Sequence, residues 1–199
     1  MSSKPYIVIG VPLAPDRKAD FENGVFCGSF TGIKNVEVIA KPVHETAYGR
    51  NLIIIDAMAI PEMTHILFVD ADVVPPSETL GALLALNKPV AAGIYTLDLE
   101  GKKHWSASVI GSGGSYAWLE HGKEPQQPFQ AMAIAGGCML VRREVLQAVG
   151  WPWFEYIYDS GGGRTGEDIY FVNRVKECGF EIWVNPAIKC KHFHTKDIT

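Results

Sequence analysis

The sequence lacks several patterns that identify common classes of protein. Its four cysteines, Cys27, Cys138, Cys178 and Cys190, form no C-x-x-C pair, so neither a disulfide framework nor a four-cysteine zinc site is predicted. No run approaches the roughly 20 apolar residues that cross a bilayer. The apolar run that follows the first residues is too short for a secretory signal. We therefore expect a protein without a membrane span in the reducing cytoplasm.

A basic excess is also missing. The chain has 18 Lys and Arg residues against 22 Asp and Glu residues, a formal net charge of −4. Binding to nucleic acid needs a basic surface that neutralises phosphates, so nucleic acid is not an expected partner. The motifs G-x-G-x-x-G after the first predicted strand, G-x-x-x-x-G-K-[ST] and G-x-S-x-G are absent as well. Their absence disfavours dinucleotide-dependent oxidoreductases, P-loop NTPases and α/β-hydrolases.

The chain does contain enough apolar residues for a substantial core. Hydrophobic residues make up 47% and charged residues 20% of its 199 residues. A chain of this length buries roughly 70% of the surface that it exposes when unfolded, which is enough for stability without a structural metal. We expect a single domain over residues 1–199.

Apolar and turn patterns predict strands that alternate with helices in the first hundred residues. The predicted strands are 6–12, 36–40, 65–74 and 89–96, and the predicted helices are 16–30, 46–63 and 77–86, the last capped by Ser77. This alternation predicts a parallel, doubly wound α/β sheet. The second half has more loops, including a flexible one at 161–163, with predicted strands 105–110, 116–119, 131–141 and 181–184 and helices 143–149 and 167–178.

Two carboxylates follow the predicted strand at 66–69. Asp70 and Asp72 lie at the carboxyl end of this strand, the edge at which open α/β sheets bind ligands. Residues at i and i+2 of a strand point to the same side, so both carboxylates can converge on one hard cation. The alternative is a solvated acidic turn.

Two further groups of polar residues have both a structural and a chemical interpretation. Glu167 and Asp168 open a predicted helix, where acidic residues complement the helix dipole, but a carboxylate there could also accept a proton from a substrate hydroxyl. His192 and His194 follow the last strand and are either a surface pair or metal ligands.

An aromatic cluster lies between the two predicted helices of the second half. Trp151 and Trp153 stand close to Phe154, Tyr156 and Tyr158. The cluster is either a plug of the core or a stacking platform for a sugar ring.

Taken in order, these segments resemble the GT-A-fold glycosyltransferases, which transfer a sugar from a nucleotide-sugar donor. The resemblance extends from Ile7 to His194. It rests on the segments 68–76 (FVDADVVPP), 89–95, 135–142 (AGGCMLVR), 152–154 (PWF), 166–171 (GEDIYF), 179–180 and 182–186, followed by His192.

The resemblance implies a GT-A type, Rossmann-like and mostly parallel sheet flanked by helices, with a smaller mixed or antiparallel part in the second half. Residues 1–98 would form the nucleotide-binding half and residues 99–199 the acceptor and metal-histidine half. The implied activity is metal-dependent transfer of a sugar from a nucleotide-sugar, with a UDP-sugar as the first expectation, to the hydroxyl of a carbohydrate or other acceptor. The implied cofactor is Mn²⁺ or Mg²⁺.

The resemblance also implies roles for individual residues. The implied metal ligands are Asp70, Asp72, His192 and His194, and the implied catalytic pair is Asp168, as general base, with Glu167. The implied donor-binding residues are Pro12, Leu13, Arg50, Asp70, Ala71, Gly136 and Gly137. For the acceptor we expect Trp151 and Trp153. Many members have an acidic residue for uracil after the second strand, whereas this chain has Lys41-Pro42, which leaves the nucleotide base open.

Two other functions remain open at this point. A sugar nucleotidyltransferase could use a similar sheet with paired carboxylates, although the chain has no glycine-rich basic loop for a triphosphate after its first strand. A catalytically silent carbohydrate-binding module could use the tryptophan cluster. The stereochemistry of transfer and the oligomeric state are not predicted.

Overall fold

The computed structural model describes residues 4–13, 36–42, 44–111 and 116–193. The predicted helix at 16–30 lies outside the described residues. The helices are α2 (Thr46–Met58), α3 (Thr79–Ala85), α4 (Arg143–Val149) and α5 (Glu167–Glu177). The strands of the large sheet are β1 (Ile7–Leu13), β2 (Val36–Pro42), β3 (His65–Val69), β5 (Val90–Ile94), β9 (Phe129–Gln130), β11 (Cys138–Arg142) and β14 (Ile182–Lys189).

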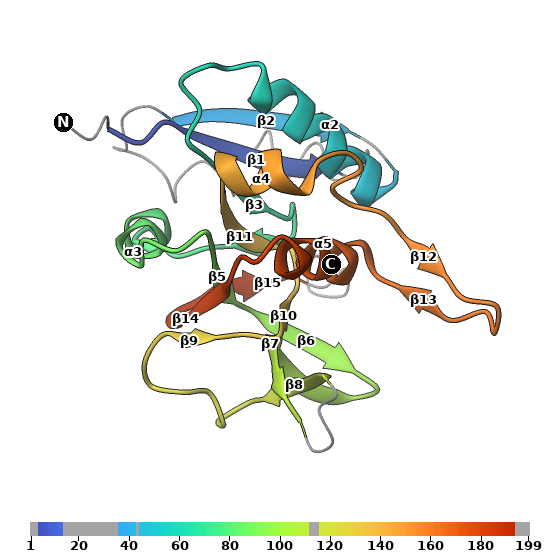
Figure 1. The fold of residues 1–199 in the computed structure, drawn as a ribbon. Coiled ribbons are helices and arrows are strands. Elements are labelled where there is room, and N and C mark those ends of the chain that lie inside the picture. The colour runs from blue at the N-terminus through green and yellow to red at the C-terminus, as the bar shows by residue number, and fades with distance from the viewer. Residues whose placement is uncertain (1–3, 14–35, 43, 112–115, 194–199) are drawn as a thin grey trace.

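The large sheet has seven strands in the order β2-β1-β3-β11-β5-β14-β9 (Figure 1). Strands β1 and β2, β1 and β3, and β5 and β14 pair in parallel, while β11 is antiparallel to both β3 and β5. Five of the seven strands therefore run in one direction, and the predicted mostly parallel α/β sheet is confirmed. Strand β11, from the second half of the chain, separates β3 from β5.

Helices cover both faces of this sheet, which explains why β1 is buried along its whole length. Alternate residues of a strand point to opposite faces. Val8 packs on one face with α2, α4 and α5, while Ile7, Ile9 and Val11 pack on the other face with α3. Continuous β-branched runs are typical of strands buried on both faces.

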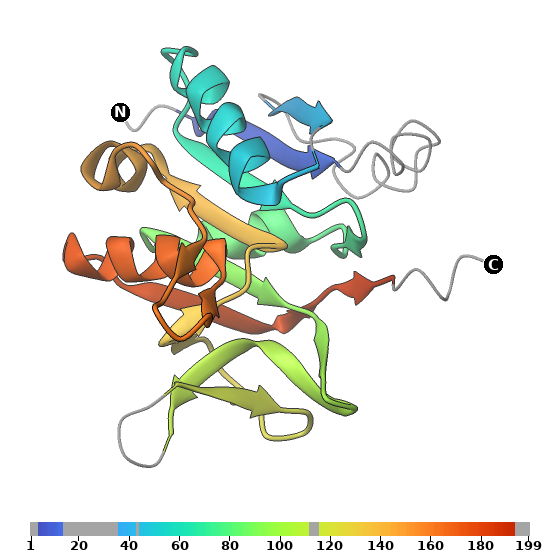
Figure 2. The ribbon, with the colours of Figure 1, turned by 90° about the vertical axis from the view of Figure 1, so that its right-hand side faces the viewer.

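A second, antiparallel sheet lies below the large one in both Figure 1 and Figure 2. It consists of β6 (Thr96–Leu99), β7 (Lys102–Ile110), β8 (Tyr116–Glu120) and β10 (Ala133–Ile134). The predicted antiparallel part in the second half is thus confirmed. Two short pairs complete the fold: β12 (Ile157–Tyr158) with β13 (Arg164–Thr165), and β4 (Val73–Val74) with β15 (Lys191–His192).

Several predicted boundaries differ from the structure. The predicted strand at 65–74 is divided into β3 and β4 by a turn, and the predicted strand at 131–141 is interrupted at 135–137. Ser77 does not cap α3, because Glu78 occupies the N-cap position and the Ser77 hydroxyl donates to the Glu78 carboxylate. The loop at 161–163 is the tip of the β12–β13 hairpin, where Asp159 Oδ1 accepts the backbone N–H groups of Gly161 and Gly163.

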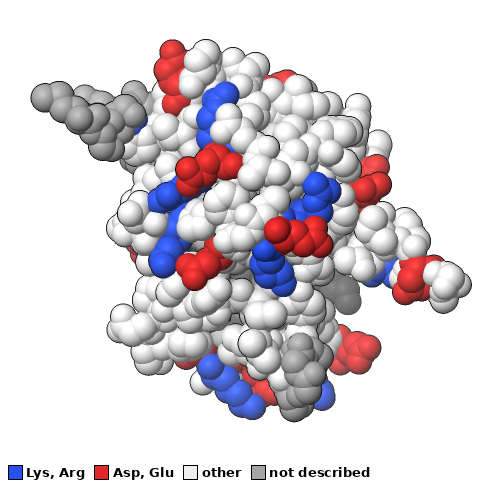
Figure 3. Space-filling view, viewed as in Figure 1, with Lys and Arg blue, Asp and Glu red and all other residues white. Residues whose placement is uncertain are grey.

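The surface is mixed in charge on the face that Figure 3 shows. There, Lys and Arg side chains stand beside Asp and Glu side chains rather than in a patch of one sign. In the described part of the chain, no helix is long and apolar enough to cross a membrane.

Candidate active site

Four segments that are far apart in the sequence meet at one edge of the large sheet. They are the turn after β3, the loop that enters β11, the start of α5 and strand β15. The turn after β3 and the β11 loop are linked directly, because the N–H of Asp70 donates to the carbonyl of Gly137 at 3.2 Å. This edge is the carboxyl end of the parallel strands, where α/β sheets bind ligands.

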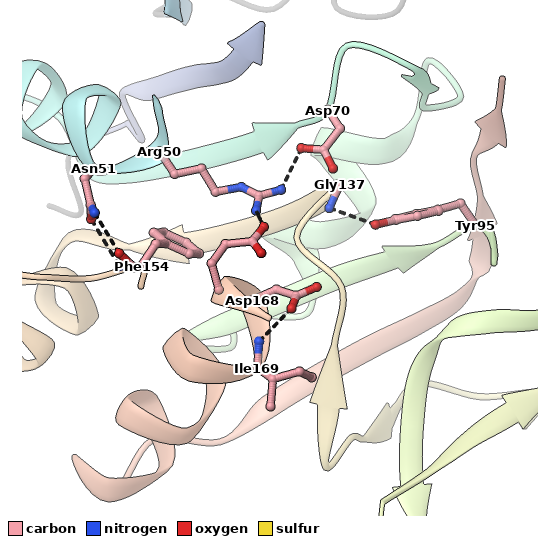
Figure 4. Close-up of polar contacts among 9 residues, drawn as sticks. Arg50, Asn51, Asp70, Tyr95, Gly137, Phe154, Asp168 and Ile169 are labelled. Atoms are coloured by element: carbon pink, nitrogen blue, oxygen red, sulfur yellow. Dashed lines mark hydrogen bonds and ion pairs between the residues drawn. The ribbon is translucent and has the colours of Figure 1, made fainter. Parts of the chain in front are cut away.

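Arg50 of α2 joins two of these segments (Figure 4). Its Nη2 donates to Asp70 Oδ1 at 2.6 Å, and its Nη1 donates to Glu167 Oε1. The Arg50 guanidinium lies 5.4 Å from the centre of the Phe154 ring, and the residue is only 1% exposed. Although burial opposes a charge, the carboxylates of Asp70 and Glu167 raise the pKa of Arg50 further above its ordinary value. Arg50 is therefore a permanently charged bridge between the end of β3 and the start of α5.

Two glycines permit the close packing around this bridge. A Cβ atom on Gly136 would lie 2.7 Å from the Arg50 guanidinium, and one on Gly137 would lie 2.9 Å from Asp70 Oδ2 and 2.7 Å from the Tyr95 hydroxyl oxygen. The N–H of Gly137 donates to this hydroxyl oxygen at 3.1 Å. Any larger side chain would displace the charged groups, which explains why glycines precede β11.

The two acidic residues in the first turn of α5 differ in how their charges are compensated. Glu167 is paired with Arg50, whereas Asp168 Oδ1 accepts the backbone N–H of Ile169 at 2.8 Å (Figure 4). Burial, together with the charge of Glu167, raises the pKa of Asp168 to about 6. Burial also raises the pKa of Asp70, with Arg50 acting in the opposite direction. Asp168 has the pKa of a general base that works near neutral pH.

The pairing of β4 with β15 places His192 beside Asp72. His192 stands opposite Val73 in this pair, and its Nε2 lies 3.7 Å from Asp72 Oδ2. Its Nδ1 lies 2.7 Å from the carbonyl oxygen of Thr96, so Nδ1 is the donor and, in the neutral ring, Nε2 carries the lone pair. The Asp72 carboxylate raises the pKa of His192. A histidine oriented through a backbone carbonyl in this way has the arrangement of a metal ligand.

The chemistry of this pair fits a divalent ion. A carboxylate with an imidazole suits Mn²⁺, and Mg²⁺ takes carboxylate with water and phosphate oxygens. Among the described residues, no three His, Cys, Asp or Glu side chains converge as a ready ion site. His194, the fourth expected ligand, lies outside the described residues.

The other expected residues are distributed over several positions. Pro12 and Leu13 are buried at the end of β1, on the same edge of the sheet as Asp70. Trp151 is 61% exposed, whereas Trp153 packs on the core and its indole N–H donates to the carbonyl of Leu146 in α4. These contacts make Trp153 a part of the scaffold and leave Trp151 accessible to a ligand.

The contacts of Arg50 were not foreseen from the sequence, where the resemblance implied only that Arg50 binds the donor. Asn51 was missed too: its Nδ2 donates to the carbonyl of Phe154 and its Oδ1 accepts the N–H groups of Trp153 and Phe154. A signal was available, because Arg50 and Asn51 are adjacent polar residues directly before the apolar run Leu52 to Ile55 of the predicted helix. Polar groups in such a place are buried with partners.

Comparisons with known proteins identify the family and the fold of the chain. A sequence model of glycosyltransferase-like family 2 matches residues 33–199. A search of curated protein sequences found no match. The crystal structure of A197 from STIV is similar in fold, with a TM-score of 0.63 and 18% identity over 96% of this chain and 87% of that one. The crystal structure of GalNAc-T7 with UDP, GalNAc and Mn²⁺ has a TM-score of 0.59 and 13% identity, and the match covers 98% of this chain but 45% of GalNAc-T7.

Proposed function

Because the chain belongs to glycosyltransferase-like family 2 and is a glycosyltransferase of the GT-A fold, we propose that it transfers a sugar from a UDP-sugar to an acceptor hydroxyl with the help of a divalent ion. The observation that carries the proposal is the pair of Asp72 and His192 at the same edge of the sheet where Arg50 joins Asp70 to Glu167, at the start of α5. The GalNAc-T7 structure contains UDP and Mn²⁺, which supports this choice of donor and ion.

Asp72 and His192 would hold the ion, with His194 as a further ligand and Asp70 in contact with the ion or the donor ribose. The ion, Mn²⁺ or Mg²⁺, would neutralise the charge of the leaving diphosphate. Donor contacts would come from the end of β1, the turn after β3 and the loop before β11, through Pro12, Leu13, Ala71, Gly136 and Gly137. Arg50 would contribute to this donor site through Asp70.

Asp168 would act as the general base of an inverting transfer. Its carboxylate takes the proton of the acceptor hydroxyl while that oxygen bonds to the anomeric carbon and the bond from this carbon to the diphosphate breaks. Glu167, held by Arg50, would orient the first turn of α5 and contact the acceptor. Trp151 would offer its exposed ring to the acceptor sugar, with Trp153 beneath it, the two ring centres being 5.9 Å apart. We place this reaction in the cytoplasm.

The test is incubation of the protein with a panel of UDP-sugars and GDP-sugars in Mn²⁺ or in EDTA. We expect Mn²⁺-dependent release of UDP, by slow hydrolysis without an acceptor and faster with one. Release of pyrophosphate from a nucleoside triphosphate and a sugar 1-phosphate would instead identify a nucleotidyltransferase. Carbohydrate binding in EDTA without any donor cleavage in Mn²⁺ would identify a binding module.

A further inference from the structure

Arg50 connects the two sides of the candidate active site through a single planar group. One branch of its guanidinium binds Asp70, at the end of β3, and the other binds Glu167, at the start of α5. We propose that Arg50 is a positioning residue, which sets the donor-side carboxylate Asp70 and the acidic pair of α5 at a fixed separation. This inference rests on the proposed function, because it assigns the two carboxylates to donor and acceptor.

The surroundings of Arg50 closely match the planar shape of a guanidinium. Phe154 packs against the guanidinium, and Gly136 approaches it so closely that a Cβ atom would lie 2.7 Å away. A lysine ammonium is a point charge on a flexible stem, so it cannot hold two carboxylates in the geometry of a fork. The site therefore depends on the shape of the group as well as on its charge.

One atom of Arg50 indicates a role beyond stability. Its Nε is buried and has no hydrogen-bond partner in the described part of the chain. A buried donor without a partner destabilises the folded state. Unsatisfied buried groups of this kind call for an explanation, and strain at a functional site is one. The guanidinium is oriented so that Nη1 and Nη2 bind the two carboxylates, and this orientation leaves Nε unsatisfied within the described residues.

The bridge also assigns different tasks to Glu167 and Asp168. Glu167 is engaged by Arg50, whereas Asp168 accepts the backbone N–H of Ile169 in its own helix turn. Since the two residues are adjacent in the first turn of α5, holding one fixes the direction of the other. Arg50 thus positions Asp168 through Glu167, in addition to the direct attraction between the guanidinium and the Asp168 carboxylate.

The test compares Arg50→Lys, Arg50→Met, Glu167→Gln and the double variant Arg50→Met/Glu167→Gln. The assay is UDP release from the UDP-sugar that the wild-type protein cleaves fastest, in Mn²⁺, with the acceptor that accelerates it. A misplacement of about 1 Å can cost about 10²-fold in rate. We expect kcat to fall about 10²-fold in Arg50→Met and about tenfold in Arg50→Lys, with the donor KM changed less than about threefold.

The double variant tests whether Arg50 acts through Glu167. Residues that act as a unit show strongly non-additive losses. We therefore expect kcat of Arg50→Met/Glu167→Gln to lie within about threefold of kcat of Arg50→Met. A loss equal to the product of the two single losses would overturn the proposal.

Arg143→Met is the matched control. Arg143 is also an arginine that binds more than one oxygen. It donates to the carbonyl of Met58, the last residue of α2, at 2.9 Å, and to the carbonyl of Ile60 at 2.8 Å, and neither acceptor belongs to the acidic pair of α5. We expect this variant to unfold at lower urea concentration with an unchanged kcat. If Arg50→Lys and Arg50→Met show the same pattern, Arg50 is only structural and the proposal is wrong.

Urea unfolding separates failure of this inference from failure of the proposed function. The unfolding equilibrium constants of the wild type, Arg50→Met, Glu167→Gln and the double variant form a double-mutant cycle. The amount by which the change in the double variant departs from the product of the two single changes measures the coupling of Arg50 to Glu167 without any substrate. We expect a coupling of about tenfold or more in this equilibrium. If the wild-type protein cleaves no donor but this coupling is present, the proposed function fails while the bridge stands; if the coupling is absent, the bridge itself is refuted.

Discussion

Asp70 and Asp72 are two residues apart, yet the structure holds them in different ways. Asp70 is bound by the buried guanidinium of Arg50 and lies beside the loop that enters β11. Asp72 is 37% exposed at its side chain and faces His192, which a pair of two-residue strands brings to it. The first carboxylate, with a side chain that is 26% exposed, is anchored to the core through Arg50, whereas the second lies further out on the rim of the protein.

This difference shows how one short motif can serve two purposes. A carboxylate fixed by core helices defines distances within the site before any ligand arrives. A carboxylate on the rim, opposite an imidazole, can adjust to an ion and its water ligands. We therefore expect substitutions on the rim to affect ion-dependent activity with little effect on folding.

The largest effect is expected for Asp72→Asn. Removal of the charged ligand should reduce Mn²⁺-dependent UDP release about 10³-fold, because the leaving diphosphate loses its neutralising ion. The thermal shift that UDP with Mn²⁺ produces should disappear, while the melting temperature without ligands should stay the same. Asp70→Asn is the comparison variant. If Asp70→Asn abolishes the thermal shift and Asp72→Asn leaves it intact, then Asp70 rather than Asp72 is the main ligand of the ion.

The second effect concerns Asp168→Asn. General-base catalysis contributes about 10²–10⁴-fold, so transfer to the acceptor should fall by about 10³-fold or somewhat less. Binding of UDP with Mn²⁺, measured by calorimetry, should be unchanged. Asp159→Asn, in the hairpin turn, is a suitable control for the loss of one carboxylate. Normal transfer by Asp168→Asn would refute the role of the base and would favour a retaining mechanism.

The pH dependence of the wild-type enzyme follows from the same residue. Since the pKa of Asp168 is raised to about 6, the base is protonated and inactive at lower pH. We expect kcat to fall about tenfold per pH unit below about pH 6 and to be level above it. The residual rate of Asp168→Asn should not show this fall at low pH. If kcat of the wild type fell only below about pH 4, the ordinary pKa of an aspartate, this would contradict the buried environment of Asp168.

The raised pKa of Asp168 also affects the stability of the folded protein. Its pH dependence has the opposite sign from that of a carboxylate whose pKa is lowered by an ion pair. The folded state disfavours the charged form of Asp168, so the protein loses stability as pH rises from about 4 to about 6. Asp168→Asn should therefore be more stable than the wild type at pH 7.5, by about 1–3 kcal/mol. The two proteins should be equally stable below about pH 4. Urea unfolding at the two pH values measures this difference.

The smallest effect is expected at Glu124, whose carboxylate pairs with Lys189 rather than with a group of the candidate site. The Lys189 ammonium, with the indole N–H of Trp105, lowers the pKa of Glu124 to about 2. This stabilisation is present above about pH 4.5 and is lost as pH falls towards 2. Glu124→Gln should lower the melting temperature at pH 7 by about 2–4 °C and leave the Mn²⁺ dependence of activity unchanged. An altered Mn²⁺ dependence would mean that the small sheet contributes to the ion site.

Most of the fold could be predicted from the sequence because apolar runs and turn residues report local structure directly. The run at Ile7 to Val11 and the glycine after α5, Gly179 with φ 82°, are signals of this kind. The position of β11 between β3 and β5 could not be predicted in this way. Pairing between segments 70 residues apart depends on which sheet edge is available, and neither propensity nor periodicity contains that information.

The candidate site could be predicted only where a short motif carried it. Asp70, Asp72, Glu167 and Asp168 belong to short contiguous patterns that are visible in the sequence, although each pattern also has a structural explanation. The contacts of Arg50 depend on three segments that meet only in the folded chain, so no spacing in the sequence reveals them. The pair of Asp72 and His192 was expected from resemblance alone, since 120 residues separate the two.

The place of β11 also has a consequence for the order in which the chain can fold. Strand β5 has β11 and β14 as its neighbours, and both are synthesised after it. The buried residues of β5 therefore leave the ribosome about 45 residues before the first partner strand is available, and chains synthesise at about 5–20 residues per second. During those seconds an apolar strand with two unpaired edges is open to mispairing, which is the hazard of long-range sheet topologies. Expression at lower temperature or with chaperones should therefore improve the yield of folded protein.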